Sequence, residues 1–377
     1  MTSFLGRPAQ DAQSGTVPAW LPGGDFTVGV EDELLMVDDA GQLLGRAAAT
    51  VLASVQREDS SGTVKPEIFL DQVELGTPVC SDADELVSSL ATLREEVGMA
   101  AALMGVGVHP SAALGVAPTA SSPRYDHLVK EFAGLLRTPT AGFQVHVGIP
   151  DPDTAMLVYR GLRNRLPLLR ALAAGSPYWH ARDSGLACAR AALLRSYPRT
   201  TLPPVLRSWD RYVETIERQM WAADVPDYTF VCWELRPQPR LGTIEVRVMD
   251  AQHSLARIAG LTALVQGLAR YAVEVPDRAD LPDDLLLADD FAACRYGLDA
   301  RIVDADGSRR PLREVARQGL VEAHKMLAPQ DHAAPLEIVQ SMLGGQPEYT
   351  RQRRLCKERG MSALLDDLVS RTMRRDI

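Results

Sequence analysis

The chain has 377 residues, of which 46% are hydrophobic and 24% charged, which is enough apolar material for a large core. Its formal net charge of −9 disfavours a nucleic-acid surface, because binding a phosphate backbone requires a cationic face. The five cysteines are widely spaced without a CxxC pair, which indicates a reduced compartment and gives no zinc motif. We expect a soluble, cytoplasmic protein with no membrane partner, because no signal-like segment precedes the first strand and the apolar runs are short.

Hydrophobic periodicity predicts strands and helices along most of the chain. Residues 1–24 are rich in Gly, Pro, Gln and Ser and indicate a loose lead-in. The predicted strands are 26–38, 142–150, 229–236 and 243–250, and the predicted helices are 81–103, 153–174 with a kink at Pro167, 209–222 and 255–273. A long ordered loop is predicted over 175–204, and a polar link near 277–290 precedes a mostly helical, finally basic remainder. This order predicts an α+β or mixed α/β class.

Polar side chains alternate with apolar ones in five strand-like segments. Residues two apart on a strand share a face, about 6–7 Å from each other. The polar sets are Glu31 with Glu33, Gln72 with Glu74, Gln144 with His146, Glu234 with Arg236, and Thr243 with Glu245 and Arg247. One interpretation is an antiparallel sheet whose polar face lies in water. The other is a metal–phosphate site, because crowded carboxylates repel one another unless cations such as Mg²⁺ or Mn²⁺ hold them, and arginines suit phosphate oxygens.

Common nucleotide and nucleophile motifs are missing from the sequence. There is no G-x-x-x-x-G-K-[ST] loop and no G-x-G-x-x-G after a strand, so bound ATP would depend on carboxylate-held metal ions for its phosphates. No G-x-S-x-G elbow provides a serine nucleophile. His146 is open to a structural interpretation, but its place beside the acidic residues favours contact with a phosphate or a metal.

Several segments, in order, resemble the carboxylate–amine ligase family related to glutamate–cysteine ligase (type 2, YbdK-like). They are Gly29–Glu33, Val64–Glu67, Gln72–Cys80, Val145–Asp151, Ser176–Trp179 with Arg182–Asp183, Trp233–Pro237, Gly242–Gln252, Ala293–Ala300 and Arg351–Arg353. The resemblance implies an α+β fold like that of glutamine synthetase, with a curved antiparallel sheet, helices on its convex face and an active site on its concave face. It also implies one catalytic domain over residues 25–377 and an enzyme that uses ATP to form an amide bond. The suggested assembly is a homodimer.

The resemblance assigns roles to individual residues. The expected metal ligands are Glu31, Glu33, Glu74 and Glu245. The expected catalytic residues are Arg247, Arg236 and His146, and Arg247, Glu67 and Gln144 are expected near ATP. The substrate candidates are Arg182, Asp183, Arg190, Glu234, Arg351 and Arg353, although the last two also fit a surface charge run.

The hypothesis is an ATP-dependent ligase that makes an acyl phosphate from an amino-acid-like carboxylate and passes it to an amine, releasing ADP and phosphate. The family usually has His-Val-His where this chain has Gln144-Val145-His146, and residues 289–292 also depart from its pattern. These departures predict a substrate pair other than glutamate and cysteine. The alternatives are a non-catalytic nucleotide- or amino-acid-binding relative and a metal-dependent hydrolase that needs no ATP.

Overall fold

An antiparallel sheet lies at the centre of the fold. The computed structural model describes residues 16–113, 115, 117–276, 279–304 and 307–374. The strands are β1 (Val28–Val37), β2 (Arg57–Asp59), β3 (Gly62–Pro66), β4 (Gln72–Gly76), β5 (Ala102–Met104), β6 (Gly142–Gly148), β7 (Tyr178–Trp179), β8 (Arg182–Asp183), β9 (Leu235–Gln238), β10 (Thr243–Asp250), β11 (Arg301–Val303) and β12 (Arg309–Pro311). Within the described residues the main sheet has the order β2-β3-β4-β1-β6-β10-β9, with β5 also paired to β1, while β7–β8 and β11–β12 form separate hairpins.

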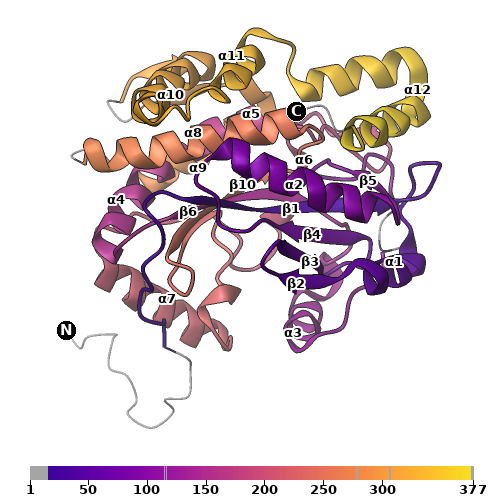
Figure 1. Cartoon of the computed structure of the whole chain (residues 1–377), viewed down its shortest axis with the longest axis horizontal. Coiled ribbons are helices and arrows are strands. Elements are labelled where there is room, and N and C mark those ends of the chain that lie inside the picture. Colours follow the sequence, from indigo (N-terminus) through magenta and orange to yellow (C-terminus); the bar gives the residue numbers. More distant parts are fainter. Residues whose placement is uncertain (1–15, 114, 116, 277–278, 305–306, 375–377) are drawn as a thin grey trace.

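Helices surround this sheet, and several of them cover its apolar face. They are α1 (Ala48–Val55), α2 (Ala83–Gly98), α3 (Pro123–Phe132), α4 (Pro152–Arg163), α5 (Leu166–Ala173), α6 (Ala189–Leu194), α7 (Trp209–Ala223), α8 (Leu255–Glu274), α9 (Asp283–Tyr296), α10 (Leu312–Leu327), α11 (Leu336–Gly344) and α12 (Glu348–Thr372). Figure 1 shows α2 and α8 on one side of the sheet, with α10 and α11 outside α8, and α3 and α7 toward the other side. The fold is therefore α+β.

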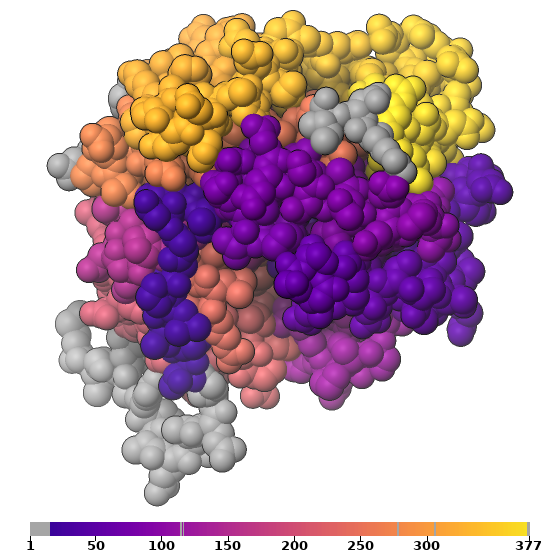
Figure 2. Space-filling model, viewed as in Figure 1, coloured from indigo at the N-terminus to yellow at the C-terminus, as the bar shows by residue number. Residues whose placement is uncertain are grey.

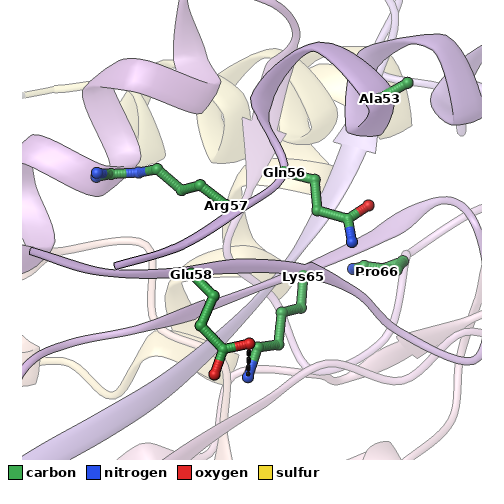
Figure 3. Close-up of a pocket in the computed structure, with 6 residues that line it drawn as sticks. All are labelled: Ala53, Gln56, Arg57, Glu58, Lys65 and Pro66. Carbon is green, nitrogen blue, oxygen red and sulfur yellow. Dashed lines mark ion pairs between the residues drawn. The ribbon is translucent and has the colours of Figure 1, made fainter. Parts of the chain in front are cut away.

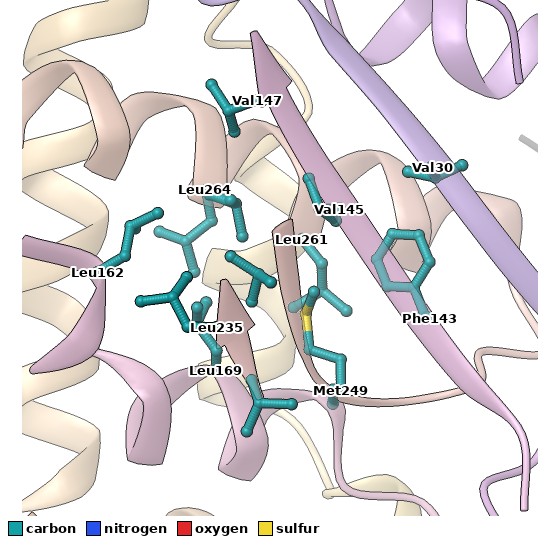
Figure 4. Close-up of a cluster of buried hydrophobic side chains, with 14 of the residues drawn as sticks. Val30, Phe143, Val145, Val147, Leu162, Leu169, Leu235, Met249, Leu261 and Leu264 are labelled. Atoms are coloured by element: carbon teal, nitrogen blue, oxygen red, sulfur yellow. The ribbon is translucent and has the colours of Figure 1, made fainter. Parts of the chain in front are cut away.

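The core between sheet and helices contains the apolar residues of the alternating strands. Val145 and Val147 of β6 point toward Leu261 and Leu264 of α8 (Figure 4), and all four side chains are buried. Full burial of one such side chain stabilises the fold by about 1.5–3 kcal/mol. Because neighbouring residues point to opposite faces, this packing directs the intervening polar residues of the same strands to the other face.

The structure corrects several predicted elements. The predicted strand over 229–236 is wrong for most of its length, since a 3₁₀ turn occupies Tyr228–Phe230 and β9 begins at Leu235. The predicted kinked helix over 153–174 is two helices, and Pro167 lies in the first turn of the second one. Proline is accepted there because its missing N–H has no helical partner in the first turn. The predicted polar link near 277–290 is wrong from Asp283 onward, where α9 begins. The predicted loop over 175–204 contains α6 and the β7–β8 hairpin.

Residues 16–24 contain no helix or strand but lie on the body of the protein. The Trp20 indole donates to the Ile149 carbonyl at 3.2 Å and meets the Trp209 ring edge-on at 5.4 Å between centroids. Gly23 N donates to the same Ile149 carbonyl at 2.9 Å. Figure 2 shows this indigo segment running across the surface against later parts of the chain. Residues 1–15 of the predicted lead-in lie outside the described residues.

Within the described part of the chain, no helix combines the length and apolar character needed to cross a membrane.

Candidate active site

The strand register brings the predicted polar residues onto one face of the sheet. Directly paired residues of an antiparallel ladder project to the same face. Three such pairs join neighbouring strands: Glu33 opposite Glu74, Glu31 opposite Gln144, and His146 opposite Glu245. A fourth pair, Glu245 opposite Arg236, extends the polar face to β9. The face therefore runs continuously from β4 across β1, β6 and β10.

An acidic group forms at the β4 side of this face. Glu33, Glu67 and Glu74 each offer a carboxylate oxygen, and these oxygens lie within 4.8 Å of one another. Burial raises the pKa of Glu74 well above its ordinary value, and the charges of Glu31, Glu67 and Glu33 raise it further. Burial and the charge of Glu67 also raise the pKa of Glu33 to about 7, against the opposing effects of Arg190, Arg247 and a hydrogen bond from the Gly142 N–H.

A second group lies across β1, β6 and β10. Ligand atoms of Glu31, His146 and Glu245 also approach within 4.8 Å of one another. His146 Nδ1 lies 2.9 Å from the Thr243 hydroxyl, and its Nε2 lies 3.6 Å from a Glu31 oxygen. Burial lowers the pKa of His146, but the nearby Glu31 carboxylate and the charge of Glu245 outweigh it, so the pKa is raised. Burial raises the pKa of Glu31, whereas His146 lowers it, with a net lowering.

Arginines neutralise the β10 side of the face. Arg236 donates to Glu245 at 2.7 Å, and Arg247 donates to the other Glu245 oxygen. Burial raises the pKa of Glu245, but Arg236 and Arg247 together hold it well below its ordinary value. Arg247 also donates to the Gln144 amide oxygen, and the Gln144 amide nitrogen donates to Glu33. Gln144 therefore links a carboxylate to a guanidinium in one hydrogen-bonded chain.

The acidic group has the properties expected of a divalent cation site. Within the described part of the chain, no ion pair joins Glu67 or Glu74 to a basic side chain. Lys65 lies opposite Glu74 in register, yet its ammonium pairs with Glu58 at 3.6 Å. Carboxylate oxygens are the ligands that Mg²⁺ and Mn²⁺ prefer, and a bound cation would offset the repulsion within the group. The residues present therefore fit a divalent metal.

Of the predicted substrate residues, Arg190 and Glu234 are buried and use their charges within the protein. Arg190 donates to the backbone carbonyls of Arg247 and Met249 at 3.3 and 3.1 Å. Glu234 precedes β9, and it accepts hydrogen bonds from Arg170 at 2.6 Å and from Arg195 at 3.3 Å. The prediction that Glu234 and Arg236 share a strand face is therefore wrong.

The other predicted substrate residues lie on β8 and α12. Asp183 and Arg353 form a two-point ion pair, with both hydrogen bonds at 2.8 Å. Arg351 pairs with Glu348 at 2.7 Å and with a second carboxylate of its own helix. Arg182 is exposed beside Asp183 on β8. None of these contacts joins the polar face of the main sheet.

Sequence reasoning missed two residues of the site. Gln238 of β9 donates to Glu245 at 2.5 Å, and its position two residues after Arg236 on one strand is a signal that could have found it. Tyr125 of α3 donates its hydroxyl to the Pro66 carbonyl at 3.1 Å. Burial raises the Tyr125 pKa, and the charges of nearby Glu67 and Glu74 raise it further, which places this ring beside the acidic group. A lone tyrosine on an amphipathic helix gives no signal of that position.

An open hollow of about 600 Å³ adjoins the edge of the sheet near β2 and β3. Figure 3 shows Lys65 and Glu58 paired at its margin, with the Gln56 amide directed toward the space. Its lining includes none of Glu33, Glu67 and Glu74, so this hollow does not contain the acidic group.

Comparisons with known proteins show the family and the fold. The model of glutamate-cysteine ligase family 2 matches residues 27–361. A Rubrobacter xylanophilus protein named "Putative glutamate--cysteine ligase 2-3" is 34% identical over 361 residues, covering 92% of this chain and 97% of that protein. A Gloeobacter violaceus protein named "Putative glutamate--cysteine ligase 2" is 31% identical over 371 residues, covering 94% and 97%. The solved glutamate–cysteine ligase of Francisella tularensis in complex with AMP shares the fold, with a TM-score of 0.73 and 14% identity over 94% of this chain and 89% of that one.

The fold and the matched families define a carbon–nitrogen ligase that depends on ATP. The chain belongs to glutamate–cysteine ligase family 2, because the family model covers most of its length and the relatives match along nearly all of theirs.

Proposed function

We propose that this chain activates a carboxylate as an acyl phosphate with ATP and passes the acyl group to an amine, releasing ADP and phosphate. The observation that carries the proposal is a single sheet face on which two carboxylate-rich groups lie beside Arg236 and Arg247. Phosphoryl transfer needs little covalent participation by the protein, because it depends mainly on positioning and on electrostatic stabilisation. A face that combines carboxylates for cations with arginines for phosphate oxygens meets both needs.

The metal ligands are drawn from both groups. Glu33, Glu67 and Glu74 would hold one divalent cation, and Glu31, also on β1, and Glu245 on β10 would complete the set that binds ATP. A bound Mg²⁺ or Mn²⁺ would neutralise phosphate charge and polarise the transferring phosphoryl group.

Arg247 is proposed to contact the phosphoryl group as it moves. Its side chain is 23% exposed, and two fixed acceptors, Gln144 and Glu245, hold the guanidinium in place. Because the group is already oriented, it can stabilise developing charge with little rearrangement. Arg236 keeps Glu245 ionised, and His146 is proposed to donate from Nε2 to a phosphate oxygen. That nitrogen is buried, and the Glu31 oxygen near it, at 3.6 Å, lies beyond hydrogen-bond distance.

The substrate pair is proposed to differ from glutamate and cysteine, because Gln144 stands where the family usually has a histidine and contacts Arg247 next to the proposed phosphoryl site. Arg182 is the substrate candidate whose side chain remains exposed, and the Asp183–Arg353 pair lies directly beside it. We propose that Arg182 contacts the carboxylate or the amine, whereas Asp183 and Arg353 are engaged with each other. Arg190, Arg351 and Glu234 are engaged by other protein groups.

The test is an incubation of the purified chain with Mg·ATP, a panel of carboxylates that includes glutamate, and a panel of amines, with ADP, AMP and phosphate measured separately. ADP and phosphate release that requires both a carboxylate and an amine would support the proposal and identify the pair. AMP release would replace the acyl phosphate with an adenylate. Hydrolysis of a substrate without ATP would indicate a metal-dependent hydrolase, and nucleotide binding without turnover a binding protein.

Two variants and a control sharpen this test. Glu245→Gln and Glu33→Gln should each abolish turnover while the chain stays folded, because each removes a charge from the proposed ligand set. Glu58→Gln is the matched control, since Glu58 is an exposed acid on β2 and lies outside both carboxylate groups. Normal turnover by Glu245→Gln would refute the assignment.

A further inference from the structure

β10 is irregular at the residue proposed to contact the phosphoryl group. Its pairing with β6 shifts register between Val246 and Met249, so Arg247 and Val248 together lie opposite Gln144 alone. This two-against-one arrangement is a β-bulge, which bends a strand and redirects a side chain. Here the bulge places the Arg247 guanidinium against the Gln144 amide oxygen.

Buried arginines bind the carbonyls of this bulge. A bulge interrupts the ladder and leaves backbone groups that need other partners. Arg190 of α6 donates from Nη1 to the Met249 carbonyl at 3.1 Å and to the Arg247 carbonyl at 3.3 Å. Arg170 of α5 donates from Nη1 to the Val248 carbonyl at 3.3 Å. Three successive carbonyls are therefore each bonded to a guanidinium from outside the sheet.

The Arg190 guanidinium lies buried against Gly142. Its side chain is buried, and the residue is 4% exposed. A Cβ added to Gly142, at the start of β6, would lie 2.3 Å from Arg190 Nη2. The Arg190 backbone N–H donates to the Ser176 hydroxyl at 3.3 Å, which fixes the start of α6. The guanidinium therefore reaches β10 from a fixed anchor, and its Nη1 and Nη2 donate to backbone carbonyls.

We propose that Arg190 is a positioning residue that fixes the β10 bulge and thereby aims Arg247 at the transferring phosphoryl group. The proposal rests on the proposed function of Arg247. It replaces the sequence-based expectation that Arg190 contacts substrate. Arg170 supports the same bulge, but it also pairs with Glu234 and Asp290, so its removal would leave buried carboxylates without a partner.

A double-mutant cycle tests the proposal. Arg190→Met, Arg247→Met and the double variant are compared for kcat and for the KM of each substrate. Arg190→Met should lower kcat by about 10²-fold, the effect of misplacing a reacting group by about 1 Å, with the carboxylate KM changed less than about threefold. The double variant should be no slower than Arg247→Met, because a residue that acts only through Arg247 adds nothing once Arg247 is gone.

Two results would overturn the proposal. A rise of more than about tenfold in carboxylate KM, with effects that multiply those of Arg247→Met, would make Arg190 a direct substrate contact. An unchanged kcat for Arg190→Met would show that the bulge does not depend on it. Arg190→Lys, which keeps the charge but has a single amino donor group, should fall between wild type and Arg190→Met, and it serves as the variant if Arg190→Met does not fold.

Arg163→Met is the matched control. Arg163 of α4 is also buried, and it donates to two backbone carbonyls, those of Pro203 at 2.8 Å and Leu281 at 2.6 Å, away from β10. Its loss should reduce stability without the fall in kcat per folded molecule. If wild type shows no turnover, the proposed function fails, and the same cycle is then read by calorimetry from the Kd of the magnesium complex of a non-hydrolysable ATP analogue, which keeps the γ-phosphoryl group that Arg247 is proposed to contact. Non-additive losses of affinity would still support Arg190 as a positioning residue, and additive losses would refute it.

Discussion

Glu74→Gln should stabilise the metal-free protein while removing its response to divalent cations. Glu74 is confined with Glu33 and Glu67, their oxygens lying within 4.8 Å of one another. Two unit charges at this separation repel by about 3–4 kcal/mol at an effective dielectric of about 20. Part of this repulsion is already relieved by proton uptake, because the pKa of Glu74 is raised by burial and by its acidic neighbours. We therefore expect the neutral amide to stabilise the fold by about 1–3 kcal/mol.

The assay is thermal unfolding at pH 7.5 in a chelator and in a titration of MgCl₂ or MnCl₂. Wild type should gain stability with metal, by about 2.7 kcal/mol at a concentration 100 times the Kd, and Glu74→Gln should gain much less. Glu58→Gln, the exposed control, should change stability by less than about 0.5 kcal/mol and should keep the full response. A Glu74→Gln protein that is less stable in chelator, or that keeps the wild-type metal response, would refute the reasoning.

Three further predictions concern stability. Arg94→Met should cost about 3–5 kcal/mol in chemical denaturation, because it strands the buried carboxylate of Asp32, now paired at 2.8 Å; a loss below 1 kcal/mol would contradict this. Burial lowers the pKa of His253 to about 3, so between pH 6.5 and 3 the unfolded chain binds a proton that the folded chain does not, and the free energy of unfolding falls as the pH is lowered. His253→Gln should make this fall with pH shallower. The same dependence of unfolding free energy on pH in variant and wild type would contradict the prediction. Gly267→Ala should destabilise the protein by about 1–3 kcal/mol in chemical denaturation, although alanine has the better helix propensity. The reason is that its Cβ would lie 2.6 Å from the Ala323 Cβ of α10. Unchanged stability would show that α10 can move away without cost.

Strand periodicity was sufficient to predict the polar face. Glu31 and Glu33 alternate with buried Val30 and Leu34, and this pattern survives because the apolar set must pack against α8. The same holds for β4, β6 and β10, so the candidate ligands on these strands were predictable without knowledge of the strand order. Which carboxylates form a common group was not predictable, because it depends on register between strands far apart in the chain.

Predictions failed where local pattern and tertiary contacts disagreed. The segment before β9 alternates like a strand, yet Glu234 turns away to meet Arg170 and Arg195. An acid of this kind is stable when buried only beside cations, and those cations come from α5 and the end of α6. Arg190 was expected at substrate because arginine suits carboxylates, but its donors are used by carbonyls that a bulge exposes. A sequence does not show a bulge or the carbonyls it frees.

The sequence by itself determined the strands and helices in which buried apolar residues recur at a regular spacing, and it determined the family resemblance. It also determined which residue types make up a metal–phosphate face, because alternation along a strand decides which side chains share a face. Only the tertiary structure decided how those side chains combine. Strand register divided the acids into two groups, Arg236 and Arg247 neutralised one of them, and buried Arg190 was placed behind β10 rather than in the site. These outcomes depend on contacts between residues far apart in the chain, such as Gly142 and Glu33, which form a hydrogen bond across 109 positions. Local propensity carries no information about such contacts.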